Sequence, residues 1–199
     1  MTNMAKDKYY LLDEEIKTGM AYVEDIPQID PPYDDVWIDG VALDDGVPAP
    51  FEYYLMNDEE PLYESSIIKG QMRHYYSETP PLMSDEMLDI LFSMGVDNID
   101  TYEAILHVEG REKPLTNYKA VNIIGNVFAL DDGRSESESL GMGDEMGAPK
   151  FFRKMKVAEE KVKGLLLFRP EERASQIIVH ESIKQALRAI FKESEFTEV

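Results

Sequence analysis

Stretches of apolar and aromatic residues, separated by short runs of Asp, Gly and Pro, predict a chain built mostly from strands. The most sheet-like run is residues 118–130, and it ends in Asp131-Asp132-Gly133, a sequence typical of a tight turn. Shorter strand segments are predicted at residues 66–68 and 72–76, while residues 51–56 and 151–162 each fit a strand or a short helix. The remaining predicted strands are residues 8–12, 102–108, 165–168 and 176–179, and a last one from Phe196 onward.

Two helices are predicted from the helical spacing of apolar residues. The first covers residues 81–95, with Ser84 placed to cap its N-terminus and Gly95 placed to end it. The second begins at Glu181 and reaches about Phe191. The two segments align without gaps, which fits either a shared strand–helix pattern or an internal duplication. In this alignment the apolar positions Met83, Met87, Leu91 and Met94 match Val179, Ile183, Leu187 and Ile190.

Two parts of the chain lack such periodicity. Residues 24–50 are rich in Pro and Asp, which favours loop or edge structure, and we expect Trp37, the only tryptophan, to pin this arm to the core. Residues 134–150 are rich in Ser and Gly and predict an exposed, mobile loop. The predicted fold is α+β, with a mixed or mainly antiparallel sheet, two or three packed helices including a C-terminal helix, and an acidic, Pro-rich N-terminal arm. We expect a single domain over residues 1–199, made of the arm (1–60) and a core (60–199).

Charge is distributed unevenly along the chain. The net charge is −20, and residues 1–64 hold 17 acidic and 3 basic side chains, whereas residues 150–199 hold 8 acidic and 11 basic ones. Such a field repels nucleic acid and membrane phosphates and attracts basic proteins, although solubility alone is an alternative explanation. The chain has no cysteine and no apolar run near the roughly 20 residues that cross a bilayer, and we expect no secretory signal. We therefore expect a cytoplasmic protein.

The sequence contains no recognisable catalytic motif. Its three histidines, His74, His107 and His180, lie outside any metal-binding spacing, and the Gly-x-Ser-x-Gly motif of serine hydrolases is absent. His107 and Glu109 would share one side of a strand, which fits a shared metal or a cross-strand surface pair. His180 fits a helix cap or a surface group rather than a base. We therefore predict no enzyme activity, no cofactor and no metal.

Three segments of the chain resemble the conserved segments of a known protein family. Residues 117–135 form an Asn-rich apolar run that ends in Asp131 and, four positions on, Ser135; residues 165–169 end in Phe168-Arg169; residues 177–187 read Ile-Ile-Val-His-Glu at a helix entry, where the family usually has serine in place of His180. The family is a set of myxobacterial-type immunity proteins found beside polymorphic toxins. The resemblance covers about residues 60–199. It implies a protein that binds and neutralises a cognate toxin and catalyses no reaction. Because Asp side chains bond backbone amides two residues on, we expect Asp131 and Ser135 to clamp a turn.

Three function hypotheses follow. In the first, a cytoplasmic immunity protein meets a basic toxin through its acidic arm, with Trp37 and Tyr54 as aromatic anchors. In the second, the chain is an acidic structural or accessory protein of a phage or secretion system, without a toxin partner. The third is an enzyme that uses a carboxylate and a histidine. A homodimer is compatible with each hypothesis. The predicted contact residues are Asp34, Asp35, Trp37, Asp39, Asp44, Asp45, Tyr54, Asp58, Glu59 and Glu60.

Overall fold

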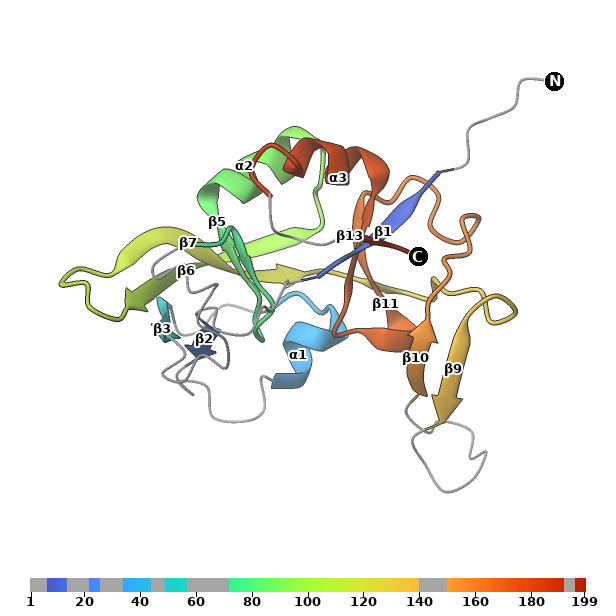
Figure 1. Ribbon diagram of the computed structural model, residues 1–199, viewed down its shortest axis with the longest axis horizontal. Helices are drawn as coiled ribbons and strands as arrows, with labels where there is room; N and C mark the ends of the chain where they lie inside the picture. Colours follow the sequence, from blue (N-terminus) through green and yellow to red (C-terminus); the bar gives the residue numbers. More distant parts are fainter. Residues whose placement is uncertain are drawn as a thin grey trace, which may run out of the picture.

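The protein has a mixed α+β fold in the computed structural model (Figure 1). The structure describes residues 7–13, 22–25, 34–43, 49–56, 72–139, 150–191 and 196–199. Within these residues the strands form three sheets, of six, five and two strands. The two longer helices lie side by side over one surface (Figure 1), and no described helix is long and apolar enough to span a membrane.

The largest sheet has six strands and mixes parallel with antiparallel pairing. Its longest strands, β6 and β7, form an antiparallel hairpin in which Ile99 pairs with Ile123 and Glu103 pairs with Lys119. Strand β3 runs parallel to β6 on the other side, with Phe51 opposite Ala104. Its strands, in spatial order, are β2 (Tyr22–Asp25), β3 (Phe51–Met56), β6 (Ile99–Val108), β7 (Leu115–Ile123), β5 (Leu82–Ser84) and β4 (Tyr75–Tyr76).

The second sheet has five strands and brings the two ends of the chain together. Strand β1 lies between β12 and β13 and is antiparallel to both, with Tyr10 opposite Val179 on one side and Glu198 on the other. A strand of the predicted N-terminal arm is thus an inner strand among C-terminal ones. In spatial order the strands are β13 (Phe196–Glu198), β1 (Tyr9–Leu12), β12 (Ile177–His180), β11 (Leu167–Pro170) and β8 (Asn126–Val127).

Two helices cover one face of the five-stranded sheet and part of the same face of the six-stranded sheet. Helix α2 (Asp85–Ser93) follows β5 directly, and helix α3 (Glu181–Leu187) follows β12 directly. Both helices bury their apolar side chains in one core, where Met87 and Leu91 of α2 meet Ile183 and Leu187 of α3. The core includes residues of β1, β7 and β11 as well, so burial of one apolar stripe per helix joins the two sheets.

The opposite faces of the sheets have cores of their own. Alternate residues of a strand point to opposite sides, so Val179 belongs to the helix-covered core whereas Ile178 belongs to a core on the other face of the five-stranded sheet. The two-stranded hairpin of β9 (Glu136–Ser139) and β10 (Lys150–Lys154) contributes Phe152 to that second core. A short helix, α1 (Asp34–Asp39), places Trp37 in a third core on the six-stranded sheet.

Several sequence predictions need correction. The run 118–130 is not one strand, because the chain leaves β7 at Ile123, turns at Gly125, which has φ +84°, and continues as β8 in the other sheet. The helix predicted from residue 81 begins at Asp85, since residues 82–84 form β5. The second helix ends at Leu187 rather than Phe191. Residues 51–56 form a strand, residues 136–139 and 150 lie in the β9–β10 hairpin, and residues 66–68 lie outside the described residues.

Candidate partner-binding surface

Trp37 anchors helix α1 to the six-stranded sheet. Its ring is 1% exposed and makes edge-on contacts with Phe51 and Tyr102, with ring centroids 5.5 Å away in both cases. The prediction that Trp37 pins this part of the chain is confirmed. Its second predicted role, as a surface anchor for a partner, is wrong, because a ring buried in the core has no face left for another protein.

The chain after α1 is held against the corner between β7 and β8. The Asn122 side-chain amide donates to the Val41 carbonyl over 2.8 Å, and Asn126 donates to Ile38 over 2.9 Å. The backbone N–H of Gly125 donates to the Gly40 carbonyl over 2.7 Å. These bonds fix the backbone on both sides of Asp39, whose side chain is exposed.

Tyr54 lies on the other face of the same sheet. Phe51, Tyr53 and Leu55 of β3 are buried in the Trp37 core, so Tyr54 points away from α1. Its ring is 36% exposed and stacks on His107, with centroids 4.5 Å apart and planes 12° apart. Trp37 and Tyr54, predicted to share one contact surface, thus lie on opposite faces of the sheet.

The face around Tyr54 carries polar side chains that helices α2 and α3 leave uncovered; we call it the open sheet face (Glu52, Tyr54, Glu103, His107 and Lys119). His107 Nε2 lies 3.0 Å from Glu52 Oε2 of the neighbouring strand. The predicted cross-strand pair of His107 is thus present, and its partner is Glu52. The Lys119 ammonium donates to both carboxylate oxygens of Glu103, over 2.8 and 2.9 Å.

The other predicted contact residues are only partly described. Asp34 and Asp35 begin α1, but their side chains lie outside the described part of the structure. Asp44, Asp45, Asp58, Glu59 and Glu60 also lie outside the described residues.

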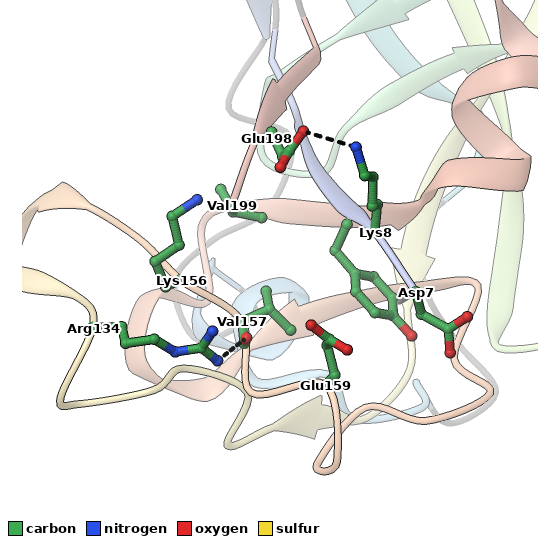
Figure 2. Close-up of a pocket in the computed structure, with 9 residues that line it drawn as sticks. Asp7, Lys8, Arg134, Lys156, Val157, Glu159, Glu198 and Val199 are labelled. Carbon is green, nitrogen blue, oxygen red and sulfur yellow. Dashed lines mark hydrogen bonds and ion pairs between the residues drawn. The ribbon is translucent and has the colours of Figure 1, made fainter. Parts of the chain in front are cut away.

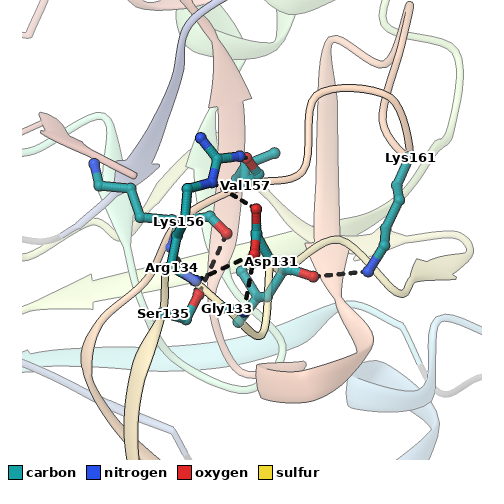
Figure 3. Close-up of polar contacts among 8 residues, drawn as sticks. Asp131, Gly133, Arg134, Ser135, Lys156, Val157 and Lys161 are labelled. Carbon is teal, nitrogen blue, oxygen red and sulfur yellow. Dashed lines mark hydrogen bonds and ion pairs between the residues drawn. The ribbon is translucent and has the colours of Figure 1, made fainter.

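The Asp131–Ser135 turn forms as the sequence predicted (Figure 3). One carboxylate oxygen of Asp131 accepts from the backbone N–H of Gly133 and Arg134, over 2.9 and 3.1 Å, and the other accepts from Nε of Arg134. These hydrogen bonds, above all the one from the Arg134 side chain, favour the ionised carboxylate and so lower the pKa of Asp131. The Ser135 hydroxyl accepts from the Lys156 N–H over 3.0 Å, which ties the turn to the chain after β10. Lys161, which donates to the Leu130 carbonyl over 2.7 Å, gave no signal in the sequence.

The Phe168-Arg169 pair is internal. Phe168 packs edge-on against Tyr9 in the core beneath β9 and β10. The guanidinium of Arg169 is buried and donates to the Ala174 carbonyl through Nη1. Burial disfavours its charged form and lowers the pKa of Arg169. Both residues therefore support the β11 strand and contribute no surface to a partner.

A cavity of about 150 Å³ lies where β1 and β13 meet the Asp131–Ser135 turn (Figure 2). Its charged lining is mixed in sign, and Lys8 and Glu198 form an ion pair at 3.7 Å. At its edge Tyr9 donates its hydroxyl to the Val162 carbonyl over 2.9 Å. Burial, with Asp7 and Glu159 nearby, raises the pKa of Tyr9 to about 12, so the phenol is neutral at physiological pH. The charged residues lining this cavity are Asp7, Lys8, Arg134, Lys156, Glu159 and Glu198.

The histidines make local contacts. His74 Nδ1 lies 2.8 Å from the Ser84 hydroxyl and 3.9 Å from Glu86, which resembles a serine–histidine–acid set. Both contacts involve the same nitrogen, and the buried Ser84 hydroxyl caps α2 by accepting from the Met87 N–H. A catalytic triad needs one partner on each histidine nitrogen and an accessible serine hydroxyl, so this set lacks the geometry of a triad.

His180 caps α3 by accepting a hydrogen bond from the Ser182 N–H, as predicted. Among the described residues, no group of three or more His, Asp or Glu is placed to hold a metal ion.

A comparison of the chain with protein-family models finds no match, and a comparison with curated proteins finds no relative.

Proposed function

We propose that the protein is a non-enzymatic, cytoplasmic immunity protein that binds and neutralises a cognate protein toxin with a basic surface. The observation that carries the proposal is the charge distribution, because 17 of the 40 acidic residues fall in the first 64 positions, against 3 basic ones. Such a surface accelerates the encounter with a cationic partner and disfavours acidic ones. The resemblance of residues 117–135, 165–169 and 177–187 to toxin-immunity proteins supports the same conclusion.

The geometry around α1 supports a rigid acidic contact. Asp39 is exposed, and the backbone beside it is bonded to Asn122, Gly125 and Asn126, while Trp37 is buried beneath it. An interface that is ordered before binding loses less conformational entropy on association. Carboxylates on such a support can meet lysine and arginine side chains of a nuclease-like toxin in place of phosphate groups.

The first test is a binding and rescue experiment with the protein encoded by the adjacent gene. We expect a one-to-one complex at low and moderate salt, and loss of that protein's toxicity when the two are co-expressed. Absence of a complex at both salt concentrations would overturn the proposal. If the purified chain instead forms a large homo-oligomer without toxin binding, the structural or accessory class replaces it.

The second test reverses charges at two matched sets of positions. Each set changes the net charge by the same amount, so a difference between them reports the location of the contact rather than long-range attraction. We expect the first set to slow association about tenfold or more at low salt and to weaken its salt dependence. Equal effects of the two sets on association would show that α1 is not part of the interface. The first set is Asp34→Lys, Asp35→Lys, Asp39→Lys and Asp44→Lys; the control set, at exposed positions, is Glu112→Lys, Asp132→Lys, Glu160→Lys and Glu171→Lys.

A further inference from the structure

A groove of about 400 Å³ lies between the end of α2, the β7–β8 corner and the segment that enters β11. Its walls are residues 95–98, residues 124, 125 and 127, and residues 164–168. Three glycines, Gly95, Gly125 and Gly164, contribute backbone to the lining, all with positive φ. A Cβ atom at Gly125 or Gly164 would meet nothing within 4 Å, so space remains open at both positions.

The walls of the groove are held together by Asn98. Its side-chain amide donates to the Ile124 carbonyl over 3.3 Å and to the Leu167 carbonyl over 3.2 Å. These two acceptors belong to different walls, so one side chain sets the spacing between them. The groove is formed before any partner arrives, which is typical of a binding site and lowers the cost of occupying it.

Exposed apolar residues lie close in the chain to the walls of this groove. Six large hydrophobic residues are exposed in the described part of the chain, and three of them adjoin the walls. Met94, 37% exposed, precedes the lining residue Gly95, and Phe128, 70% exposed, follows the lining residue Val127. Val41, 56% exposed, follows Gly40, whose carbonyl accepts from the lining residue Gly125 over 2.7 Å. Each of these residues therefore offers exposed apolar surface within a short stretch of chain from the groove.

We propose that this groove receives an apolar side chain of the cognate toxin, set among basic residues of that toxin. This inference rests on the proposed function and specifies a contact through which the protein binds the toxin. Charge complementarity favours a basic toxin as the occupant of the groove. Asp97 lines the groove and is exposed, and Asp39, also exposed, lies two positions before Val41. Within the described residues two bases flank the 164–168 wall: Lys163, beside Gly164, is exposed, and Arg169, beside Phe168, is buried. A second copy of this chain is disfavoured as occupant, since two molecules of net charge −20 repel each other.

The experiment measures the affinity of the purified chain for the protein encoded by the adjacent gene, by titration calorimetry. Phe128→Ser and Met94→Gln remove exposed apolar surface directly next to the lining residues Val127 and Gly95. Phe151→Ser is the matched control, because Phe151 is also an exposed phenylalanine, 46% exposed, and lies on β10, which contributes no residue to the groove lining. We expect Phe128→Ser with Met94→Gln to weaken binding roughly tenfold or more, as for residues central to an interface, and Phe151→Ser to leave it unchanged.

The possible outcomes distinguish a failure of the groove inference from a failure of the proposed function. Tight binding by the unaltered chain, with the same affinity for the groove variant, overturns the groove inference and leaves the proposed function standing. No binding by the unaltered chain overturns the proposed function and the groove inference with it. A dimer of the unaltered chain in sedimentation that Phe128→Ser dissociates would assign the groove to a second copy and also overturn the inference. Urea unfolding of each variant confirms that it folds, and we expect unchanged midpoints because the substituted side chains are exposed.

Discussion

Ser84 and His180 occupy the same position in two strand-to-helix junctions. Each is the last residue of a strand and the N-cap of the helix that follows it, and each accepts a hydrogen bond from the first turn, Ser84 from the Met87 N–H and His180 from the Ser182 N–H. The gapless alignment of the two segments thus corresponds to a shared strand–cap–helix unit. The two units pack together, because α2 and α3 bury their apolar stripes in one core.

Removal of the Ser84 cap should destabilise the protein. Ser84→Ala leaves the Met87 N–H without its acceptor and removes the 2.8 Å contact with His74, so we expect a loss of about 1–2 kcal/mol in the free energy of unfolding. Urea denaturation measures the change. Ser93→Ala is the control, since that exposed hydroxyl bonds only the Ile90 carbonyl of its own helix. Equal stability of the two variants would contradict the capping role.

Gly40→Ala should cost more stability than Gly110→Ala. Both glycines have positive φ, +66° and +78°, so both substitutions carry backbone strain of about 1–2 kcal/mol. A Cβ atom at Gly40 would in addition lie 2.8 Å from Asn126 Oδ1 and 2.9 Å from the Gly125 nitrogen, whereas at Gly110 it meets nothing within 4 Å. Urea unfolding of the two variants gives the difference. Equal losses would show that the chain after α1 is not held tightly against the β7–β8 corner.

Trp37 fluorescence should report a buried ring. As the only tryptophan, and 1% exposed, it should emit at short wavelength and be poorly quenched by iodide in the folded protein. A Trp37→Phe, Tyr54→Trp variant provides the comparison, because position 54 lies on the open sheet face and should be quenched readily. Strong quenching of Trp37 in the unaltered protein would contradict the docking of α1.

Stability should fall at high pH because of Tyr9. Its pKa is raised from 10.0 to about 12 in the folded state, first by burial. Between these values the unfolded chain has lost the phenolic proton while the folded protein keeps it, so the stabilisation is complete below pH 10 and disappears as the pH rises through 12. Thermal unfolding as a function of pH measures this decline. In the Tyr9→Phe variant this part of the decline in stability should be absent. If the variant and the unaltered protein show the same dependence of stability on pH, the decline is due to other groups.

Local features of the chain could be predicted from the sequence. The hydrophobic pattern predicted the strands at residues 8–12, 102–108 and 176–179, and Ser84 was correctly predicted as a helix N-cap. The Asp131 turn followed from the same reasoning, since an Asp side chain and the amides it bonds are neighbours in sequence. In each of these cases the residues that decide the structure lie within a few positions of one another.

Non-local relationships decided the rest. Residues 51–56 fit a strand or a helix, so the sequence did not reveal that Trp37 and Tyr54 face opposite sides of a sheet. Nothing in the local pattern placed β1 between β12 and β13, more than 150 residues away along the chain. The groove was missed for the same reason, since its three walls come from separate segments and Asn98 joins two of them.

The sequence by itself determined the acidic charge, its concentration in the first third of the chain, and most of the individual strands and helices, because charge and hydrophobic periodicity depend on neighbouring residues. Only the tertiary structure decided which of those residues share a surface. Strand pairing brings distant segments together. The alternation of side chains along β3 then sends Tyr54 to the open sheet face, while the packing of α1 places Trp37 in the core on the opposite face.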